Sequence, residues 1–432
     1  MNPDPAAMRN RLTALLRIEP HELAAVALSF AYYFCLLCAY YILRPIRDEM
    51  GIQGGVQNLQ WVFTGTFVVM LLAVPLFGWA AARFERRRLV PIVYYFFIAN
   101  LALFYLLFEF DVARAWVARA FFIWISVFNL FVVSVFWSLM ADVFSNAQAR
   151  RLFGIIAAGG SAGAIGGPGF TAWLAEALGP AQLIPFSVGL LVLAVVCVHG
   201  VLRLRRHDAE APLDAGAPVR GGLLAGAGHV LRSPYLLGIG LFILLYTTLS
   251  TFLYFEQAHI VKASFSDPGE RTRLFAMIDL SVNVLTVFAQ LFVMARLVER
   301  IGVALTLALI PLAVAVGFAA LGLYPTLAVL VVFQVLRRAG NYAITRPGRE
   351  VLFTVIPRED KYKSKNFIDT VVYRGGDAVS GWAFALLSAA GLALSTIAWV
   401  AVPLALLWAA NGIALGRRQE VLRAEQRQRA SP

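Results

Sequence analysis

Long apolar runs constrain the fold of this chain more than any other feature of its sequence. A helix needs roughly 20 apolar residues to cross the hydrocarbon core of a bilayer. Between breaks that contain charged residues, glycine or proline, the chain has twelve such runs: 22–43, 59–82, 89–109, 115–141, 152–178, 181–202, 234–261, 272–296, 301–322, 324–345, 367–390 and 394–416. We therefore predict an all-α polytopic membrane protein with twelve transmembrane helices.

The composition excludes an ordinary soluble domain. Hydrophobic residues make up 60% of the chain and charged residues 14%, whereas an average soluble domain has roughly 25% charged residues. In a soluble protein, the net charge of +12 would suggest a nucleic-acid partner. Basic residues also collect on the cytoplasmic side of membrane proteins, which explains the charge here. We expect the lipid bilayer as a partner and no nucleic acid.

The basic residues are distributed unevenly between alternate loops. If the N-terminus is cytoplasmic, 29 lysines and arginines fall on the inner side and seven on the outer side. This bias predicts that both termini are cytoplasmic. Arg44 follows the first run where a cleaved signal peptide would need small residues, so we expect this run to remain as a helix.

A polar stretch rich in arginine, glycine and proline separates the first six runs from the last six. Two six-helix halves joined by a cytoplasmic linker are typical of the major facilitator fold. Basic segments recur at equivalent places, such as 78–88 after the second span and 295–302 after the eighth. The predicted domains are an N-terminal bundle at 1–202, a linker at 203–233 and a C-terminal bundle at 234–432.

Polar side chains follow one stripe of the first span. Tyr33, Tyr40, Arg44 and Arg47 are spaced so that they lie within about 60° of one another on a helix. Two interpretations are open. The arginines either meet an anionic substrate, or they reach the headgroups beside an interfacial aromatic belt.

The tenth span is unusually short. Only thirteen apolar residues, 324–336, precede Arg337 and Arg338, which is too few to cross the bilayer core. The helix must continue through these arginines and Asn341, or it is interrupted there. Interrupted helices mark binding sites in transporters, whereas a tilted helix would let both arginines reach the inner headgroups.

The eighth span carries Asp279, Asn283, Thr286 and Gln290 on a single face. Lipid cannot solvate such a stripe, so it faces a water-filled cavity or forms a network with another span. Asp279 is also a candidate carrier of a proton or cation.

The eleventh span carries Asp369, Tyr373, Arg374 and Asp377. Arg374 and Asp377 are three residues apart, so they can form an ion pair within one helix that lowers their cost in the membrane. A gating role is the alternative.

Glycines recur every four residues in the fifth span, at Gly159, Gly163 and Gly167. The surrounding stretch, 157–169, is not a phosphate-binding loop, because it lacks the Gly-Lys-Ser/Thr ending and follows no strand. The spacing instead predicts close packing of two helices.

No catalytic or metal-binding pattern is present in the sequence. The five histidines are scattered, and no spacing typical of zinc ligands or of a Ser/His/Asp triad can be found. We therefore expect no enzyme activity, no bound metal and no cofactor.

Three segments, at 40–51, 136–167 and 346–377, carry a resemblance to a known family. They read YYILRPIRDEMG, FWSLMADVFSNAQARRLFGIIAAGGSAGAIGG and RPGREVLFTVIPREDKYKSKNFIDTVVYRGGD. The chain resembles the ATP:ADP antiporters, the NTT-type nucleotide transporters of bacteria and plastids. This resemblance implies a major facilitator-like fold in a bacterial inner membrane. It also implies exchange of nucleotides, whose phosphates are held by basic residues.

Individual residues match the motifs of that family. Its Leu-Arg-x-x-Lys-Asp motif falls on Arg44, Arg47 and Asp48, with arginine at position 47 where lysine is usual. Asn341 stands where the family has a lysine, and the region around Asn129 lacks an acidic residue that the family carries. The inner block of the family is matched by Arg349, Glu350, Lys361, Lys363, Lys365 and Asp369.

The site assignments combine the polar stripes with the resemblance. The residues predicted to bind the substrate are Tyr33, Tyr40, Arg44, Arg47, Asn129, Arg337, Arg338 and Asn341. The residues predicted to act in gating or coupling are Asp48, Asp142, Glu256, Asp279, Asn283, Arg346, Arg349, Glu350, Lys365, Asp369, Arg374 and Asp377.

The sequence predicts a monomeric secondary transporter that works by alternating access and exchanges nucleotides or related phosphate-bearing anions. Two other functions stay open. One is a major facilitator transporter of another small organic solute, coupled to protons through Asp279, Glu256 or Asp377. The other is a non-transporting relative that acts as a membrane sensor or docking partner.

Overall fold

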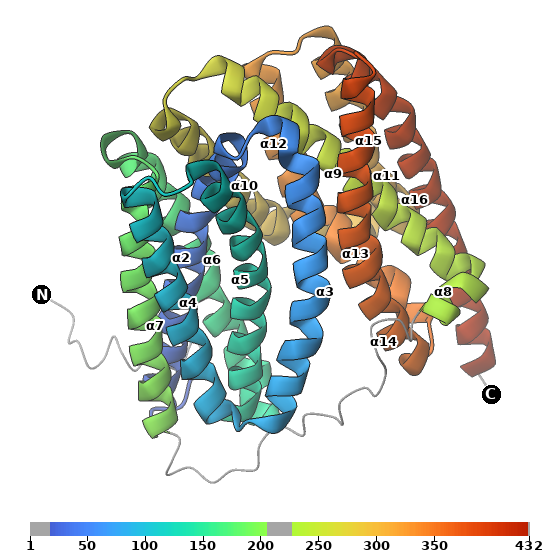
Figure 1. Ribbon diagram of the computed structural model, residues 1–432. Helices are drawn as coiled ribbons and strands as arrows, with labels where there is room; N and C mark the ends of the chain where they lie inside the picture. The colour runs from blue at the N-terminus through green and yellow to red at the C-terminus, as the bar shows by residue number, and fades with distance from the viewer. Residues whose placement is uncertain (1–17, 205–226, 431–432) are drawn as a thin grey trace, which may run out of the picture. The chain divides into compact units, whose positions relative to one another are not determined.

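The computed structural model describes residues 18–204 and 227–430. Every regular element in these two ranges is helical (Figure 1), so the predicted all-α fold is confirmed. The predicted linker at 203–233 falls mainly on residues 205–226, which lie outside the described ranges.

Fifteen α-helices make up most of the described chain, and short 3-10 or π segments adjoin several of them. The helices are α2 (Leu23–Gln53), α3 (Leu59–Arg83), α4 (Arg86–Glu109), α5 (Arg114–Val143), α6 (Asn146–Leu178), α7 (Ile184–Leu204), α8 (Ala227–Arg232), α9 (Pro234–Ser264), α10 (Pro268–Phe292), α11 (Met294–Leu323), α12 (Leu327–Gly340), α13 (Arg346–Leu352), α14 (Arg358–Phe367), α15 (Tyr373–Ala389) and α16 (Leu394–Ala430).

Eleven segments of the described chain are long and apolar enough to cross a membrane. The predicted span at 367–390 is not among them, although it is helical. It begins at the last residue of the charged helix α14 and continues through the π segment η5 (Ile368–Val372), and its apolar part, α15, has only 17 residues. The other eleven predicted spans each correspond to one of these segments.

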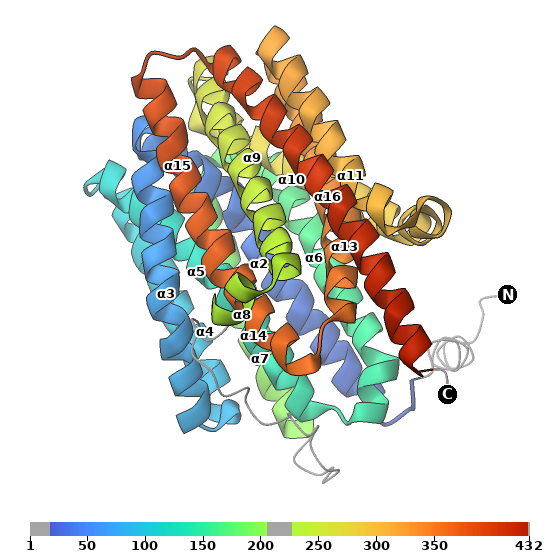
Figure 2. The same cartoon turned by 90° about the vertical axis from the view of Figure 1, so that its right-hand side faces the viewer.

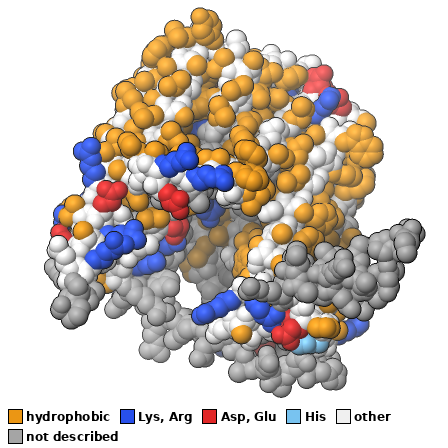
Figure 3. Space-filling view, turned by 180° about the vertical axis from the view of Figure 1, so that it is seen from behind, with side chains coloured by type: hydrophobic (Ala, Val, Ile, Leu, Met, Phe, Trp, Pro, Cys, Tyr) orange, Lys and Arg blue, Asp and Glu red, His pale blue; other side chains and the backbone are white. Residues whose placement is uncertain are grey.

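The surface is apolar over large areas. Hydrophobic side chains cover much of the face seen in Figure 3. Trp173, Val316 and Leu72 expose 76%, 70% and 69% of their side chains. Such exposure is unfavourable in water but normal for helices that face lipid.

The described chain divides into two compact units. Among the described residues, the first comprises 18–49, 73–204 and 268–277, and the second comprises 50–72, 227–267 and 278–430. Within the second unit, α9 packs against α15 and α16, and α16 packs along α11 (Figures 1 and 2). The largest core side chain of this unit is Trp408, which contacts the rings of Phe242 and Tyr246.

In the first unit, the predicted glycine contact is confirmed. Three glycines of α6, four residues apart, meet three carbonyl groups of α2 that are also four residues apart. A Cβ added to Gly159, Gly163 or Gly167 would lie 2.5, 2.4 or 2.6 Å from the carbonyl oxygen of Phe30, Phe34 or Cys38, respectively. Only hydrogen fits between these two helices, so the glycines set their distance.

The helix of the short tenth span continues past its arginines, which is one of the two alternatives that the sequence left open, but its geometry changes at Asn341. The π segment η3 (Asn341–Thr345) joins α12 to α13. Pro347 accounts for this, because a proline has no N–H to give to the carbonyl of Ala343 and its ring crowds that carbonyl. A second π segment, η5 (Ile368–Val372), joins α14 to α15. Single π turns inside helices are frequent at functional sites.

The α2–α6 contact gives the first prediction. Gly163→Ala would place a methyl group against the Phe34 carbonyl, so we expect a lower thermal unfolding temperature of the purified protein in detergent. Gly169→Ala is the matched control, because a Cβ there meets nothing within 4 Å and alanine favours helix by about 1 kcal/mol. Equal unfolding temperatures for the two variants would contradict the contact.

Candidate functional site

A buried arginine on α12 is the centre of a polar cluster in the second unit. The guanidinium of Arg337 donates through Nε and Nη2 to Gln334 Oε1, at 3.2 and 2.8 Å. Its Nη1 donates to Ser250 Oγ of α9 at 2.6 Å. Gln334 in turn donates to Gln257 of α9 at 2.5 Å. In the part of the chain that the structure describes, Arg337 has no ion pair, so only neutral oxygens hold its charge.

The neighbouring Arg338 has an acidic partner. Its Nη2 donates to Asp279 Oδ1 of α10, and the two side chains are 10% and 1% exposed. The polar stripe of α10 therefore enters an interhelical network, one of its two predicted interpretations. Farther along the stripe, Gln290 Nε2 donates to the Tyr342 carbonyl of η3 at 3.4 Å.

Two more helices carry polar groups to the same region. Asn341 Nδ2 donates to Tyr246 Oη of α9 at 3.0 Å, and the Tyr246 ring lies 5.9 Å from that of Tyr373. On α15, the predicted ion pair between Arg374 and Asp377 is present at 3.6 Å. Asp377 also accepts from Thr251 of α9 at 3.3 Å.

This cluster has an excess of positive charge. Arg337, Arg338 and Arg374 contribute three guanidinium groups, against the two carboxylates of Asp279 and Asp377. The groups come from α9, α10, α12 and α15 and lie on membrane-spanning segments or next to a π turn. Such a group of side chains can hold an anion. An uncompensated positive charge on a membrane-spanning segment is costly, and a bound anion would offset that cost.

A second ionic network of the same unit lies where α13 is followed by α14. Arg349 contacts Asp369 Oδ1 at 3.1 Å and Glu350 Oε1 at 3.6 Å, and Lys365 pairs with Glu350. These contacts tie α13 to the end of α14 and to the second π segment. Arg346, assigned to the same role from the sequence, is exposed.

In the first unit, the arginines of α2 contact aromatic rings. Arg47 donates to Asp48 Oδ1 from Nη2 at 2.6 Å and from Nε at 3.0 Å, and its guanidinium lies 4.9 Å from the centre of the Phe122 ring. Arg44 lies 5.8 Å from the Tyr41 ring. Both arginines are partly buried, and the family motif therefore occupies one polar region of α2.

The remaining predicted residues are buried or half-buried on α2, α5, α9 and α10. Tyr33 is buried, with its ring stacked 4.0 Å from Phe136 and edge-on to Trp137. Tyr40 contacts the Tyr41 ring at 5.1 Å. Asn129 and Asp142 are half-buried on α5, and Asn283 and Glu256 are buried on α10 and α9 of the second unit.

Some charged pairs were missed at the sequence level. Arg271, in the first turn of α10, donates to both carboxylate oxygens of Glu49 of α2, at 2.8 and 2.7 Å, and both side chains are buried. Arg273 pairs with Glu176 of α6 at 2.7 Å. The signal was present as arginines that the topology prediction assigns to the outer side, against the charge bias, but their partners lie more than 90 residues away.

One group of side chains has the composition of a metal site. Possible ligand atoms of Glu19, His21 and Glu22 lie within 4.8 Å of one another. Glu22, however, already accepts hydrogen bonds from Gln148 and Arg151, each at 2.9 Å. A cation there would compete with the arginine, so these contacts favour a structural role for Glu22 at the start of α2.

The sequence of this chain is similar to those of known transport proteins. The model of the family described as Major Facilitator Superfamily matches residues 25–348. The curated "ADP,ATP carrier protein 1" of Chlamydia muridarum (strain MoPn / Nigg) is 21% identical, over 83% of this chain and 81% of that protein. The resemblance to nucleotide carriers noted in the sequence is thus confirmed as a detectable similarity.

Two solved structures show the fold. A bacterial homologue of the iron transporter ferroportin, in an inward-facing state, has a TM-score of 0.65 and 14% identity, covering 92% of this chain and 99% of that one. A mutant of the nucleoside transporter NupG has a TM-score of 0.62 and 13% identity, covering 91% of this chain and 99% of that one. The predicted major facilitator fold is confirmed.

The buried pair between Arg338 and Asp279 gives the second prediction. Removing one partner of a buried pair leaves an uncompensated charge and costs on the order of 3 kcal/mol. We therefore expect Arg338→Gln and Asp279→Asn each to lower the free energy of unfolding strongly. The double variant should lose much less stability than the sum of the losses in the two single variants. Chemical unfolding of purified protein in detergent measures this double-mutant cycle.

The exposed pair of Arg114 and Asp111, 3.4 Å apart, is the matched control for that cycle. Its coupling should be at most about 1 kcal/mol, because exposed pairs are solvated. Additive effects of the Arg338 and Asp279 substitutions would show that the pair is not coupled.

Proposed function

This chain belongs to the Major Facilitator Superfamily, and we propose that it is a secondary transporter that exchanges nucleotides or related phosphate-bearing anions. Transport of this type proceeds by alternating access, in which a site near the bilayer midplane opens to one side and then the other. The observation that carries the proposal is the charge of Arg337, which is buried on a membrane-spanning segment and held by neutral oxygens.

A guanidinium in this setting favours an anionic ligand. Three of its five N–H donors are used by Gln334 and Ser250. The remaining donors suit phosphate oxygens, because arginine binds phosphate with two parallel hydrogen bonds. A bound phosphate would also offset the cost of burying the charge.

Each unit, taken by itself, carries candidate phosphate ligands. In the second unit these are Arg337 and Arg338, with Asn341 as a neutral donor beside them. In the first unit they are Arg44 and Arg47, which occupy the motif of the resembled family. Both tyrosines assigned to substrate binding already contact a ring, since Tyr33 stacks on Phe136 and Tyr40 lies edge-on to Tyr41.

The ion pairs of the second unit suit a role in gating. Asp279 and Asp377 neutralise two of the three arginines of the cluster. An anion that binds these arginines competes with the carboxylates, so binding and release of substrate would rearrange contacts between helices. Exchange follows if the empty site, with its excess positive charge, resists the conformational change that the loaded site allows.

The similarity to the chlamydial carrier supports a nucleotide as the anion. That protein is named as a carrier of ADP and ATP. The matched region covers most of both chains, and the arginines of α2 and the inner network of Arg349, Glu350 and Lys365 lie in the blocks that resemble its family.

A different observation favours a second candidate function. Glu256 of α9 is 1% exposed, and neither of its carboxylate oxygens has a hydrogen-bond partner in the ranges that the structure describes. Carboxyl groups inside membrane spans serve as proton carriers in many transporters. Proton-coupled transport of another organic solute, with Asp279 and Asp377 as further carboxyls, is therefore the alternative.

Exchange is the third prediction, and it tests the function directly. Liposomes that contain the purified protein and unlabelled ATP should take up labelled ADP, whereas the same liposomes loaded with buffer should not. The uptake should not depend on a pH gradient. Uptake of other solutes that requires a pH gradient, with no response to nucleotides, would select the proton-coupled alternative.

The arginines give the fourth prediction. Arg337→Gln and Arg47→Ala should each raise the KM for ADP roughly tenfold or more, because a hydrogen bond between charged groups contributes about 1.5–3 kcal/mol. Lysine at either position keeps the charge and should preserve more of the affinity. Arg114→Ala, on an exposed helix end, is the control. Thermal unfolding of each variant must first match the wild type, and an unchanged KM in a folded variant would remove that arginine from the site.

A further inference from the structure

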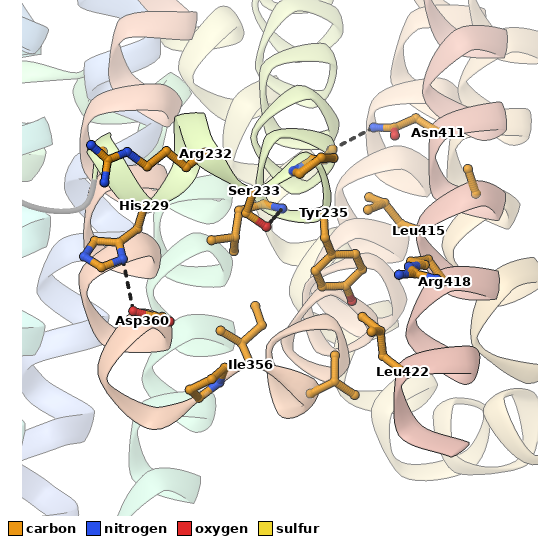
Figure 4. A pocket seen from close by; sticks show the side chains of 17 residues that line it. His229, Arg232, Ser233, Tyr235, Ile356, Asp360, Asn411, Leu415, Arg418 and Leu422 are labelled. Carbon is orange, nitrogen blue, oxygen red and sulfur yellow. Dashed lines mark hydrogen bonds and ion pairs between the residues drawn. The ribbon is translucent and has the colours of Figure 1, made fainter. Parts of the chain in front are cut away.

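A pocket outside the polar cluster around Arg337 lies at one end of the second unit. Its walls are α8, the first turns of α9, the turn at 355–360 and the C-terminal part of α16 (Figure 4). Its volume is about 900 Å³, which is within the range of sites that bind small organic ligands. None of its lining residues belongs to the predicted substrate or gating sets.

Two arginines without acidic partners flank this pocket. Arg232 of α8 and Arg418 of α16 lie on opposite sides of it (Figure 4). In the described part of the chain, neither side chain forms an ion pair or a hydrogen bond. The acidic residue of the rim, Asp360, lies 3.0 Å from His229 instead. The side chains that line the pocket therefore carry more positive than negative charge.

The floor of the pocket is apolar. Leu236, Val355 and Leu415 line it and are almost fully buried. Tyr235 directs its hydroxyl to the Leu352 carbonyl at 2.9 Å, so its ring adds to the apolar wall. A small hydrophilic anion would gain nothing from this surface, whereas a molecule with a charged head and an apolar chain would fit both parts.

The pocket also adjoins the ends of two membrane-spanning segments, where lipid headgroups are expected. Arg232 stands just before the membrane-spanning segment Pro234–Ser264, and Arg418 stands in the polar end of Leu394–Gln428. The surface beside the pocket is apolar, since Leu231 and Val421 expose 69% and 47% of their side chains.

We propose that this pocket binds an anionic phospholipid from the leaflet on the side of the C-terminus. The lipid headgroup lies at the mouth of the pocket, whose opposite edges carry Arg232 and Arg418, and one acyl chain lies on the apolar floor. Basic pockets between membrane helices on the cytoplasmic side recognise anionic headgroups in this way. The lipid would join α8 and α9 to α16, and binding to the folded state stabilises it.

Thermal unfolding in detergent, with added lipid, is the fifth prediction. Phosphatidylglycerol should raise the unfolding temperature of the wild type, and phosphatidylcholine should raise it much less. The double variant Arg232→Gln/Arg418→Gln should lose at least half of the rise. Both side chains are exposed, so the double variant should fold. The matched control is Arg417→Gln/Arg423→Gln, which removes the same charge from α16 outside the pocket and should keep the full rise.

A second pair of variants tests the apolar floor without changing charge. Ala414→Trp fills the pocket and should reduce the increase in unfolding temperature that phosphatidylglycerol causes. Ala410 lies on the exposed side of α16 outside the pocket, so Ala410→Trp should leave that increase unchanged. Native mass spectrometry of the same proteins should show one phosphatidylglycerol retained by the wild type and lost from the Arg232/Arg418 double variant.

Four results would overturn the proposal. The first is an equal rise with phosphatidylcholine, and the second is a full rise in the Arg232/Arg418 double variant. The third is the same rise with inorganic phosphate or ATP, which would make this an aqueous anion site. The proposal expects a photo-crosslinking residue at position 414 to label phosphatidylglycerol, and the fourth result is a failure to do so. Crosslinks to residues 205–226 instead would assign the pocket to the linker.

Discussion

A charge inside a membrane-spanning bundle has no water to solvate it, and this constraint organises both units of the structure. Several charged side chains of the helices have an opposite charge beside them: Arg338 has Asp279, Arg374 has Asp377 and Arg271 has Glu49. Among the described residues, Arg337 departs from this pattern, because serine and glutamine oxygens take the place of a carboxylate. Its charge is therefore not neutralised within the cluster, which is the basis of the proposed anion site.

Periodicity along single helices made much of this structure predictable. The four-residue spacing of Gly159, Gly163 and Gly167 specified a close helix contact, because residues four apart share one face. The three-residue spacing of Arg374 and Asp377 specified their ion pair in the same way. The short apolar run before Arg337 showed that this helix had to carry charge into the membrane or stop. These features depend on neighbours in sequence, so the sequence alone reveals them.

Partners on different helices could not be assigned from the sequence. The polar stripe of α10 required a solvated cavity or another helix, and only the fold identified Arg338 as the partner of Asp279. The pair of Glu49 and Arg271 joins residues 222 positions apart. Gln257 and Gln334 were overlooked because a neutral amide interrupts hydropathy less than a charge does, yet they support Arg337. Such contacts follow from the packing of helices rather than from the pattern of one helix.

The two π segments affect both the side-chain pattern along a helix and the contacts between helices. Each lies in or beside the block that resembles nucleotide carriers, and each adjoins charged residues: Arg337 and Arg338 precede η3, while Asp369 lies within η5. A π turn adds a residue to the helical turn and shifts the face on which later side chains lie. The polar residues on either side of each π segment can therefore point to different neighbours, as Arg338 does to α10 and Arg349 does to η5. Pro347, which favours the π turn, therefore helps to set the face on which Arg349 lies relative to Arg338.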